Sequence, residues 1–183
     1  MKSLLRFDNV SCRRGGRLLF EGLSLDLAAG DALQVAGPNG SGKSSLIRLA
    51  AGLLRADRGK VERVPFAFAD DHAALDRELA LGEALRFWGG DVTAGMTAVG
   101  LADLREVPVR LLSAGQAKRA SLARAAASGA PLWLLDEPAN ALDAPSLERL
   151  AALIGDHRAR GGAVLAASHV ALPGHWRVLE LGA

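Results

Sequence analysis

The chain has 183 residues and a formal net charge of +2, and half of its residues are hydrophobic. This length suits one globular domain with its own core, and the near-neutral charge gives no reason to expect a nucleic-acid partner. The single cysteine, Cys12, cannot form an internal disulfide, which indicates a reducing compartment. No run of 18 apolar residues occurs, because Arg124 interrupts the longest candidate. The sequence therefore predicts a soluble, cytoplasmic protein, and any work at a membrane requires another chain that supplies the span.

Two strands are expected at the start, over residues 4–10 and 18–27, around a turn at Gly15-Gly16. In the second of these, leucines alternate with polar residues, which is typical of a half-buried antiparallel strand. The arginines at positions 13, 14 and 17 favour a solvated face over a nucleic-acid or lipid contact.

The most informative stretch runs from residue 32 to residue 54. Residues 32–36 predict a short buried strand, and apolar residues recur at helical spacing after Lys43. The intervening GPNGSGKS fits G-x-x-x-x-G-K-[ST], whose glycines let backbone N–H groups surround a polyphosphate. Lys43 can reach the β- and γ-phosphates, and the Ser44 hydroxyl can bind Mg²⁺. The alternative is a glycine-rich turn that binds nothing, which the strand–loop–helix order disfavours. The residues expected to contact the nucleotide here are Gly37, Pro38, Asn39, Gly40, Ser41, Gly42, Lys43, Ser44 and Ser45.

After a turn at 57–60, residues 64–69 predict another apolar strand. Asp70, Asp71 and His72 follow at its carboxyl end, where open α/β sheets place ligand-binding groups. Residues 73–112 are mostly helical and carry no motif of their own. We expect one domain, 1–183, with a helical subdomain inserted at about 73–128.

The segment LSAGQ, residues 112–116, precedes a helix predicted at 117–128. Ser113 is placed to cap that helix, and its free N–H groups with Gly115 form a second candidate anion site. The capping role and the ligand role are compatible.

Four apolar residues, 132–135, run into Asp136 and Glu137, which predicts a buried parallel strand ending in two carboxylates. Asp136 can hold Mg²⁺ through water, and Glu137 can polarise the attacking water, a role worth about 10²–10⁴ in rate. The alternative is an exposed Asp-Glu turn. A strand at 163–168 ends at His169, which we expect to contact the γ-phosphate, although a lone histidine is more often structural.

Together, these segments resemble the ATP-binding subunits of ABC transporters. The motifs that carry the resemblance are GPNGSGKSS, LSAGQ, LWLLDEP, ANALD and His169. The resemblance implies an α/β P-loop NTPase of the ABC type, with an N-terminal antiparallel β-subdomain and a shortened helical subdomain. It implies ATP and Mg²⁺ as ligands, with Lys43, Glu137 and His169 as catalytic residues and Ser44 and Asp136 as metal ligands.

The resemblance also implies a homodimer with ATP at its interface. Ser113, Gly115 and Gln116 would then serve the partner's nucleotide, and Asp143 would belong to a loop that communicates across the dimer. A separate membrane-spanning permease subunit is implied, which would hold the chain on the cytoplasmic face of the inner membrane.

Three features depart from the family pattern. Arg14 stands where an aromatic residue usually stacks on adenine, although a guanidinium can also stack on a base. His72 aligns with the usual glutamine. Only 70 positions separate Lys43 from Ser113, which implies the shortened helical subdomain.

Within the family, the chain resembles the haem exporter ATPases of cytochrome c maturation. This narrower resemblance rests on VSCRRGGRLLF, LSAGQAKRASLAR, APLWLLDEPANALD and RGGAVLAASH. It implies that ATP hydrolysis drives release of a haem-loaded chaperone, with cytochrome c assembly proteins as partners. The alternatives are the ATPase subunit of another ABC exporter, a soluble ABC-type protein acting on ribosomes or DNA, and an ATP-dependent interaction module without hydrolysis.

Overall fold

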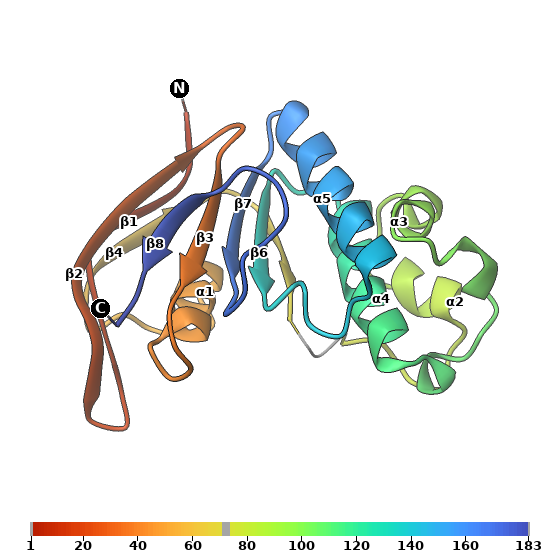
Figure 1. The fold of residues 1–183 in the computed structure, drawn as a ribbon, viewed down its shortest axis with the longest axis horizontal. Coiled ribbons are helices and arrows are strands. Elements are labelled where there is room, and N and C mark those ends of the chain that lie inside the picture. The colour runs from red at the N-terminus through yellow and green to blue at the C-terminus, as the bar shows by residue number, and fades with distance from the viewer. Residues whose placement is uncertain (1, 71–73, 183) are drawn as a thin grey trace.

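A computed structural model describes residues 2–70 and 74–182 and arranges them in two sheets with helices around the larger one (Figure 1). The smaller sheet is antiparallel, in the order β2-β1-β4. Its strands are β1 (Ser3–Arg14), β2 (Arg17–Ala28) and β4 (Arg58–Arg63). The larger sheet is parallel, in the order β5-β6-β7-β3-β8. Its strands are β3 (Ala32–Ala36), β5 (Phe66–Ala69), β6 (Leu132–Asp136), β7 (Ala163–Ala167) and β8 (Arg177–Glu180).

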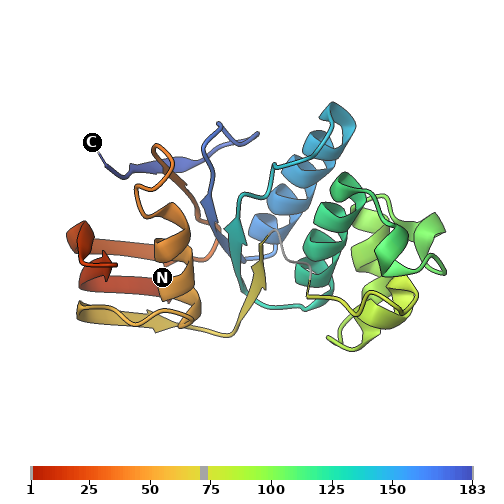
Figure 2. The same cartoon turned by 90° about the horizontal axis from the view of Figure 1, so that it is seen from below.

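The helices are distributed over both faces of the parallel sheet. They are α1 (Lys43–Ala51), α2 (Leu81–Arg86), α3 (Val92–Ala98), α4 (Ala114–Ala127) and α5 (Ala144–Ala159), with short 3₁₀ turns at Ala102–Leu104 and Val109–Leu111. Figure 2 shows α1 and the antiparallel sheet on one side of the parallel sheet and α4 and α5 on the other. Within the described residues, no helix is both long and apolar enough to cross a bilayer.

The alternation of side chains along β6 explains this layering. Successive residues of a strand point to opposite faces, so a strand buried on both faces needs apolar residues throughout. Leu132 and Leu134 join the core that lies beneath α1 and the antiparallel sheet. Trp133 and Leu135 join the second core, beneath α4 and α5. The run of apolar residues before Asp136 is therefore the sequence signature of a central strand.

The strand order brings the functional segments to one edge. β7 pairs with β6 on one side and with β3 on the other, and all three run in the same direction. The loop after β3, the acids that end β6 and the histidine that follows β7 therefore meet at the carboxyl edge of the sheet, which is where open parallel sheets bind ligands.

The predicted strands are confirmed, but one predicted turn is wrong. The segment expected to turn at 57–60 instead enters β4, which pairs antiparallel with β1. Every residue of β4 except Val61 is exposed, so this edge strand lacks the apolar alternation that identifies a strand in sequence. Its formation depends on the hydrogen bonds that β1 offers rather than on its own side chains.

Helix starts also differ from the prediction. The first helix after residue 73 begins only at Leu81, and the helix after LSAGQ begins at Ala114 instead of residue 117. Trp88, which lies just after α2, is half exposed, with the Arg124 guanidinium 4.5 Å from its ring centroid. A guanidinium over an indole face stabilises the ring by a cation–π interaction, so the ring need not be buried.

Candidate nucleotide site

The loop between β3 and α1 has the backbone geometry that a phosphate-binding loop requires. Gly42 precedes α1 with φ of 107°, a conformation that other residues rarely adopt. Gly37 is equally constrained, since a Cβ there would lie 2.3 Å from the Leu181 carbonyl oxygen. Among the described residues, no side chain caps the N-terminus of α1. Its N–H groups are therefore directed at the loop, where they favour an anion.

Lys43 extends back beneath this loop. It is only 5% exposed, and its Nζ donates to the carbonyl oxygens of Gly37 at 2.8 Å and Pro38 at 3.1 Å. The Pro38 carbonyl also accepts from the Ser41 N–H at 3.2 Å, which closes the turn. Because an ammonium group carries three N–H donors, Lys43 can bind a phosphate oxygen while it remains anchored to the loop.

Ser44 and Asp136 are 92 positions apart in sequence, but the fold brings their side chains into contact. The Ser44 hydroxyl donates to Oδ1 of Asp136 at 2.9 Å. Burial raises the pKa of the Asp136 carboxyl, and the charge of Glu137 raises it further, while the Ser44 hydrogen bond opposes both. A desolvated carboxylate beside a second acid is a site where a cation is favourable.

This pair fits Mg²⁺ bound together with a nucleotide. Among the residues that the structure describes, no group of three or more His, Cys, Asp or Glu side chains could hold a metal ion. Mg²⁺ typically binds through one or two protein oxygens, with water and substrate phosphates completing its octahedron. The hydroxyl of Ser44 and the carboxylate of Asp136 supply such oxygens next to the phosphate loop.

Glu137 stands immediately after β6 in a constrained turn. Its φ is 49°, in the left-handed region that costs a non-glycine residue about 1–3 kcal/mol. The Glu137 N–H donates to the Ala167 carbonyl at 2.9 Å, which fixes the turn against the end of β7. The Glu137 Oε2 atom lies 2.9 Å from Nδ1 of His169. The acid predicted to polarise the attacking water and the histidine predicted to contact the γ-phosphate are therefore in contact with each other.

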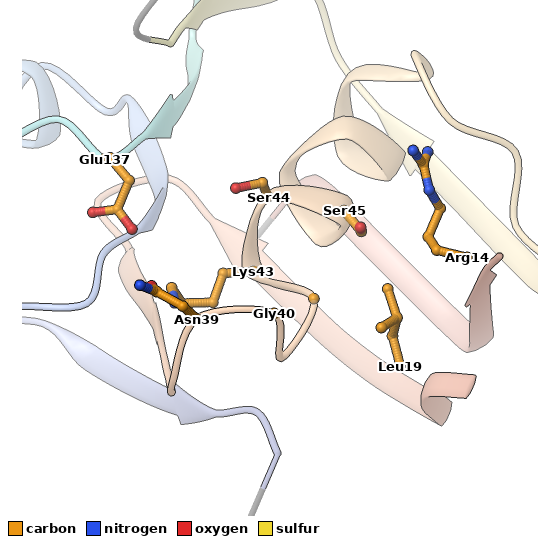
Figure 3. A pocket seen from close by; sticks show the side chains of 9 residues that line it. Arg14, Leu19, Asn39, Gly40, Lys43, Ser44, Ser45 and Glu137 are labelled. Atoms are coloured by element: carbon orange, nitrogen blue, oxygen red, sulfur yellow. The ribbon is translucent and has the colours of Figure 1, made fainter. Parts of the chain in front are cut away.

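A cavity of about 310 Å³ joins these elements (Figure 3). Figure 3 shows the Glu137 carboxylate on the opposite side of the cavity from Arg14 and Leu19, with Lys43 and Ser44 between them. The β1–β2 hairpin, which carries Arg14 and Leu19, thus supplies one wall. The cavity is lined by Arg14, Leu19, Asn39, Gly40, Gly42, Lys43, Ser44, Ser45 and Glu137.

The predicted ligand residues at the starts of α4 and α5 do not line this cavity. Ser113 and Gln116 form a reciprocal cap at the start of α4: the Ser113 N–H donates to Gln116 Oε1 at 2.8 Å, and Ser113 Oγ accepts from the Gln116 N–H. Asp143 caps α5 by accepting from the Ser146 N–H at 3.0 Å. A hydrogen bond from the Ser146 side chain, followed by this N–H bond, lowers the pKa of the Asp143 carboxyl. Figure 1 places the starts of α4 and α5 across the parallel sheet from α1.

Gly115, another predicted ligand residue, lies beside the loop that follows β6. Gly115 packs on the loop after Glu137, since a Cβ at residue 115 would lie 2.7 Å from the Ala141 carbonyl oxygen. His72 falls outside the described residues. Leu19 lines the cavity but was missed by sequence reasoning, because an apolar residue within a predicted strand carries no signal of ligand contact.

A phosphate loop opening α1, two acids ending β6 and a histidine following the neighbouring strand define an ABC-type ATP-binding domain. The family model described as ABC transporter matches residues 20–140, more than half of the chain. The chain belongs to the ABC transporter family, as a CcmA-like ATP-binding protein.

Two curated relatives give the narrower similarity. The chain is 56% identical over 180 residues to the cytochrome c biogenesis ATP-binding export protein CcmA of Sphingopyxis alaskensis, covering 94% of this chain and 93% of the relative. It is 57% identical over 164 residues to the protein of the same name from Novosphingobium aromaticivorans, covering 88% and 86%. A solved ATP-binding subunit of an ABC transporter shares the fold, with a TM-score of 0.85 at 21% identity, over 98% of this chain and 88% of that one.

Proposed function

We propose that the chain is the ATP-hydrolysing subunit of the haem exporter complex, the ABC export system of cytochrome c biogenesis. The observation that carries hydrolysis is the contact of Glu137 with His169 at a cavity that Lys43 and Ser44 also line. The narrower assignment is supported by the relatives named for cytochrome c biogenesis, with which the chain shares more than half of its residues.

The reaction follows from the positions of these groups. The loop N–H groups and the Lys43 ammonium bind the β- and γ-phosphates and hold the γ-phosphorus on the side of the cavity that Glu137 lines. Glu137 takes the proton of a water molecule as that water attacks the γ-phosphorus, and the bond to the bridging oxygen breaks to release ADP. His169 contacts the γ-phosphate from its place against Glu137. Ser44, and Asp136 through water, would hold Mg²⁺, which would supply positive charge to offset the charge that develops on the phosphate oxygens.

The assembly is a homodimer with ATP at the interface. Its support is that Ser113, Gly115 and Gln116 lie outside the cavity that contains the phosphate loop, so a second copy is needed to bring the LSAGQ segment to a nucleotide. Each chain is a single domain, 1–183, whose helical subdomain spans about 73–128. The dimer binds a separate membrane-spanning permease on the cytoplasmic face of the inner membrane and acts with cytochrome c assembly proteins, driving release of a haem-loaded chaperone.

Complementation tests this function. The tagged chain is expressed in a bacterium that lacks its own CcmA, and covalent haem attachment to c-type cytochromes is read by haem staining. We expect the wild-type chain to restore stained cytochromes and Lys43→Ala to fail. Lys60→Ala is the matched control, because Lys60 is an exposed lysine on the edge strand β4, paired with Glu62. It is expected to behave as wild type.

The same strain identifies the partner. Membranes are solubilised in detergent, and the tagged chain is captured and analysed by mass spectrometry. Capture of a multispanning subunit with cytochrome c assembly proteins supports the proposal. Capture of an unrelated permease, without restored cytochromes, would assign the chain to another ABC exporter, and capture of ribosomes would favour a soluble role.

A further inference from the structure

Gln34 is an isolated polar residue in the strand that leads to the phosphate loop. It lies at the middle of β3 and is 5% exposed, whereas its neighbours Leu33 and Val35 belong to the core beneath α1. Because side chains alternate along a strand, Gln34 points to the opposite face of the sheet. A carboxamide buried at such a position is unfavourable unless both of its ends are hydrogen-bonded.

Both ends of this carboxamide bind one short segment of backbone. Nε2 donates to the Val170 carbonyl at 2.7 Å, and Oε1 accepts from the Leu172 N–H at 3.1 Å. One donor and one acceptor are used together, which fixes the orientation of the amide. The partners are 136 and 138 positions away in sequence, so the contact ties β3 to the chain that follows β7.

That segment begins directly after His169. On the other side of His169, the Ser168 N–H donates to the Val35 carbonyl at 3.1 Å. The chain is therefore fastened to β3 both before and after the histidine, by Val35 and by Gln34. The His169 side chain itself is 48% exposed, so core packing does not hold it. Its placement against Glu137 depends on the backbone on either side.

We propose that Gln34 is a positioning residue for ATP hydrolysis, which holds the backbone after His169 so that the imidazole stays against Glu137 above the phosphate loop. The inference rests on the proposed function. Since Gln34 lies three residues before Gly37, the strand that carries the phosphate loop also sets the position of the γ-phosphate contact. Nucleotide binding needs the loop alone, whereas hydrolysis needs this second attachment.

The test separates binding from turnover in the full chain. Gln34→Met keeps the length of the side chain and removes both hydrogen bonds. We expect the kcat for ATP hydrolysis to fall by about tenfold to a hundredfold, the usual effect of a small displacement of a reacting group. The Kd for ADP is expected to stay within about twofold of wild type, because Lys43 and the loop N–H groups are untouched.

Gln34→Asn is the second variant, for the case in which Gln34→Met does not fold. Asparagine is one methylene shorter, so its amide stays polar but cannot reach both Val170 and Leu172. It is expected to lose kcat in the same way. The matched control is Arg158→Met, which also removes two side-chain bonds to backbone carbonyls, from Nε to Gly30 at 2.8 Å and from Nη1 to His175 at 3.0 Å. Gly30 lies before the opposite end of β3, so this variant is expected to lose stability in urea but keep kcat.

A double-mutant cycle shows whether Gln34 acts through His169. In the His169→Ala background, measured by single-turnover hydrolysis, Gln34→Met is expected to produce no further loss. A further loss as large as that in the wild-type background would overturn the proposal, as would a kcat for Gln34→Met within about twofold of wild type. If the wild-type chain itself does not hydrolyse ATP, the proposed function fails instead, so the two failures are distinguishable.

Discussion

Glu137→Gln is the sharpest test of the catalytic geometry, because it changes one proton acceptor and little else. The amide has the size of the carboxylate. It can therefore keep the contact with His169, whose Nδ1 lies 2.9 Å from Glu137 Oε2 in the wild-type chain. The hydrogen bonds of Lys43 and Ser44, the side chains proposed to bind the nucleotide, go to Gly37, Pro38 and Asp136 and not to this side chain. The variant should therefore bind ATP normally and fail only at the attack of water.

The magnitude follows from the role. Loss of a general base usually lowers a rate by about 10²–10⁴. At about 1.4 kcal/mol for each factor of ten, the barrier rises by about 3–5 kcal/mol. The Kd for ATP is expected to remain within about twofold of wild type. Since ATP is bound but not cleaved, the proposed dimer should accumulate when ATP is present.

The assay combines three measurements on the full chain: phosphate release at saturating Mg-ATP, binding of a fluorescent ATP analogue, and size-exclusion chromatography with and without ATP. Glu148→Gln is the matched control, because Glu148 is an exposed acid on α5. It should leave all three measurements unchanged. Phosphate release by Glu137→Gln within about threefold of wild type would show that another group accepts the proton.

Ser44→Ala should weaken ATP binding in Mg²⁺ far more than in EDTA, because it removes one metal oxygen and the bond to Asp136; equal weakening in both buffers would argue against a metal role. A different prediction concerns His157, which is buried against Trp133 with ring centroids 3.8 Å apart. Burial lowers the pKa of His157 below its ordinary value of 6.5, so the folded state favours the neutral ring. Stability should therefore be full above pH 6.5 and fall as the pH drops through this value toward the folded pKa. Urea unfolding at pH 7.5 and 5.5 checks this, and in His157→Leu the part of the pH dependence due to this ring should disappear.

The parts of the candidate site that the sequence reveals are those marked by local residue patterns at the end of a strand or the start of a helix. A parallel strand that binds ligands at its carboxyl edge is apolar along its length and polar at its end, and β6, which is apolar over 132–135 and ends in Asp136 just before Glu137, has this pattern. The glycine pattern around Gly42 is equally local, because its backbone conformation is needed whatever the rest of the chain does. Such signals do not require knowledge of which strands are neighbours.

What the sequence does not predict depends on partners distant in the chain. β4 is recognisable as a strand only once β1 is in place beside it, because its own residues are charged and exposed. Gln34 gives a weak signal, a single amide inside an apolar run, but nothing local shows that its partners follow His169. Leu19 reaches the cavity only because the β1–β2 hairpin extends beside the phosphate loop.

The start of α4 shows how a local role and a distant role coincide. Helix capping accounts fully for Ser113 and Gln116, since each satisfies a backbone group of its own helix. Capping does not account for Gly115. A side chain larger than that of glycine does not fit there, because the Ala141 carbonyl oxygen would lie 2.7 Å from its Cβ. Ala141 follows Glu137 by four residues and itself holds a left-handed conformation, with φ of 60°. Because packed backbone cannot interpenetrate, a displacement of the α4 start toward this loop must move the segment that carries Glu137. In the proposed dimer, the surface that meets the partner's nucleotide is therefore in direct contact with the loop that follows Glu137, the proposed general base of the same chain.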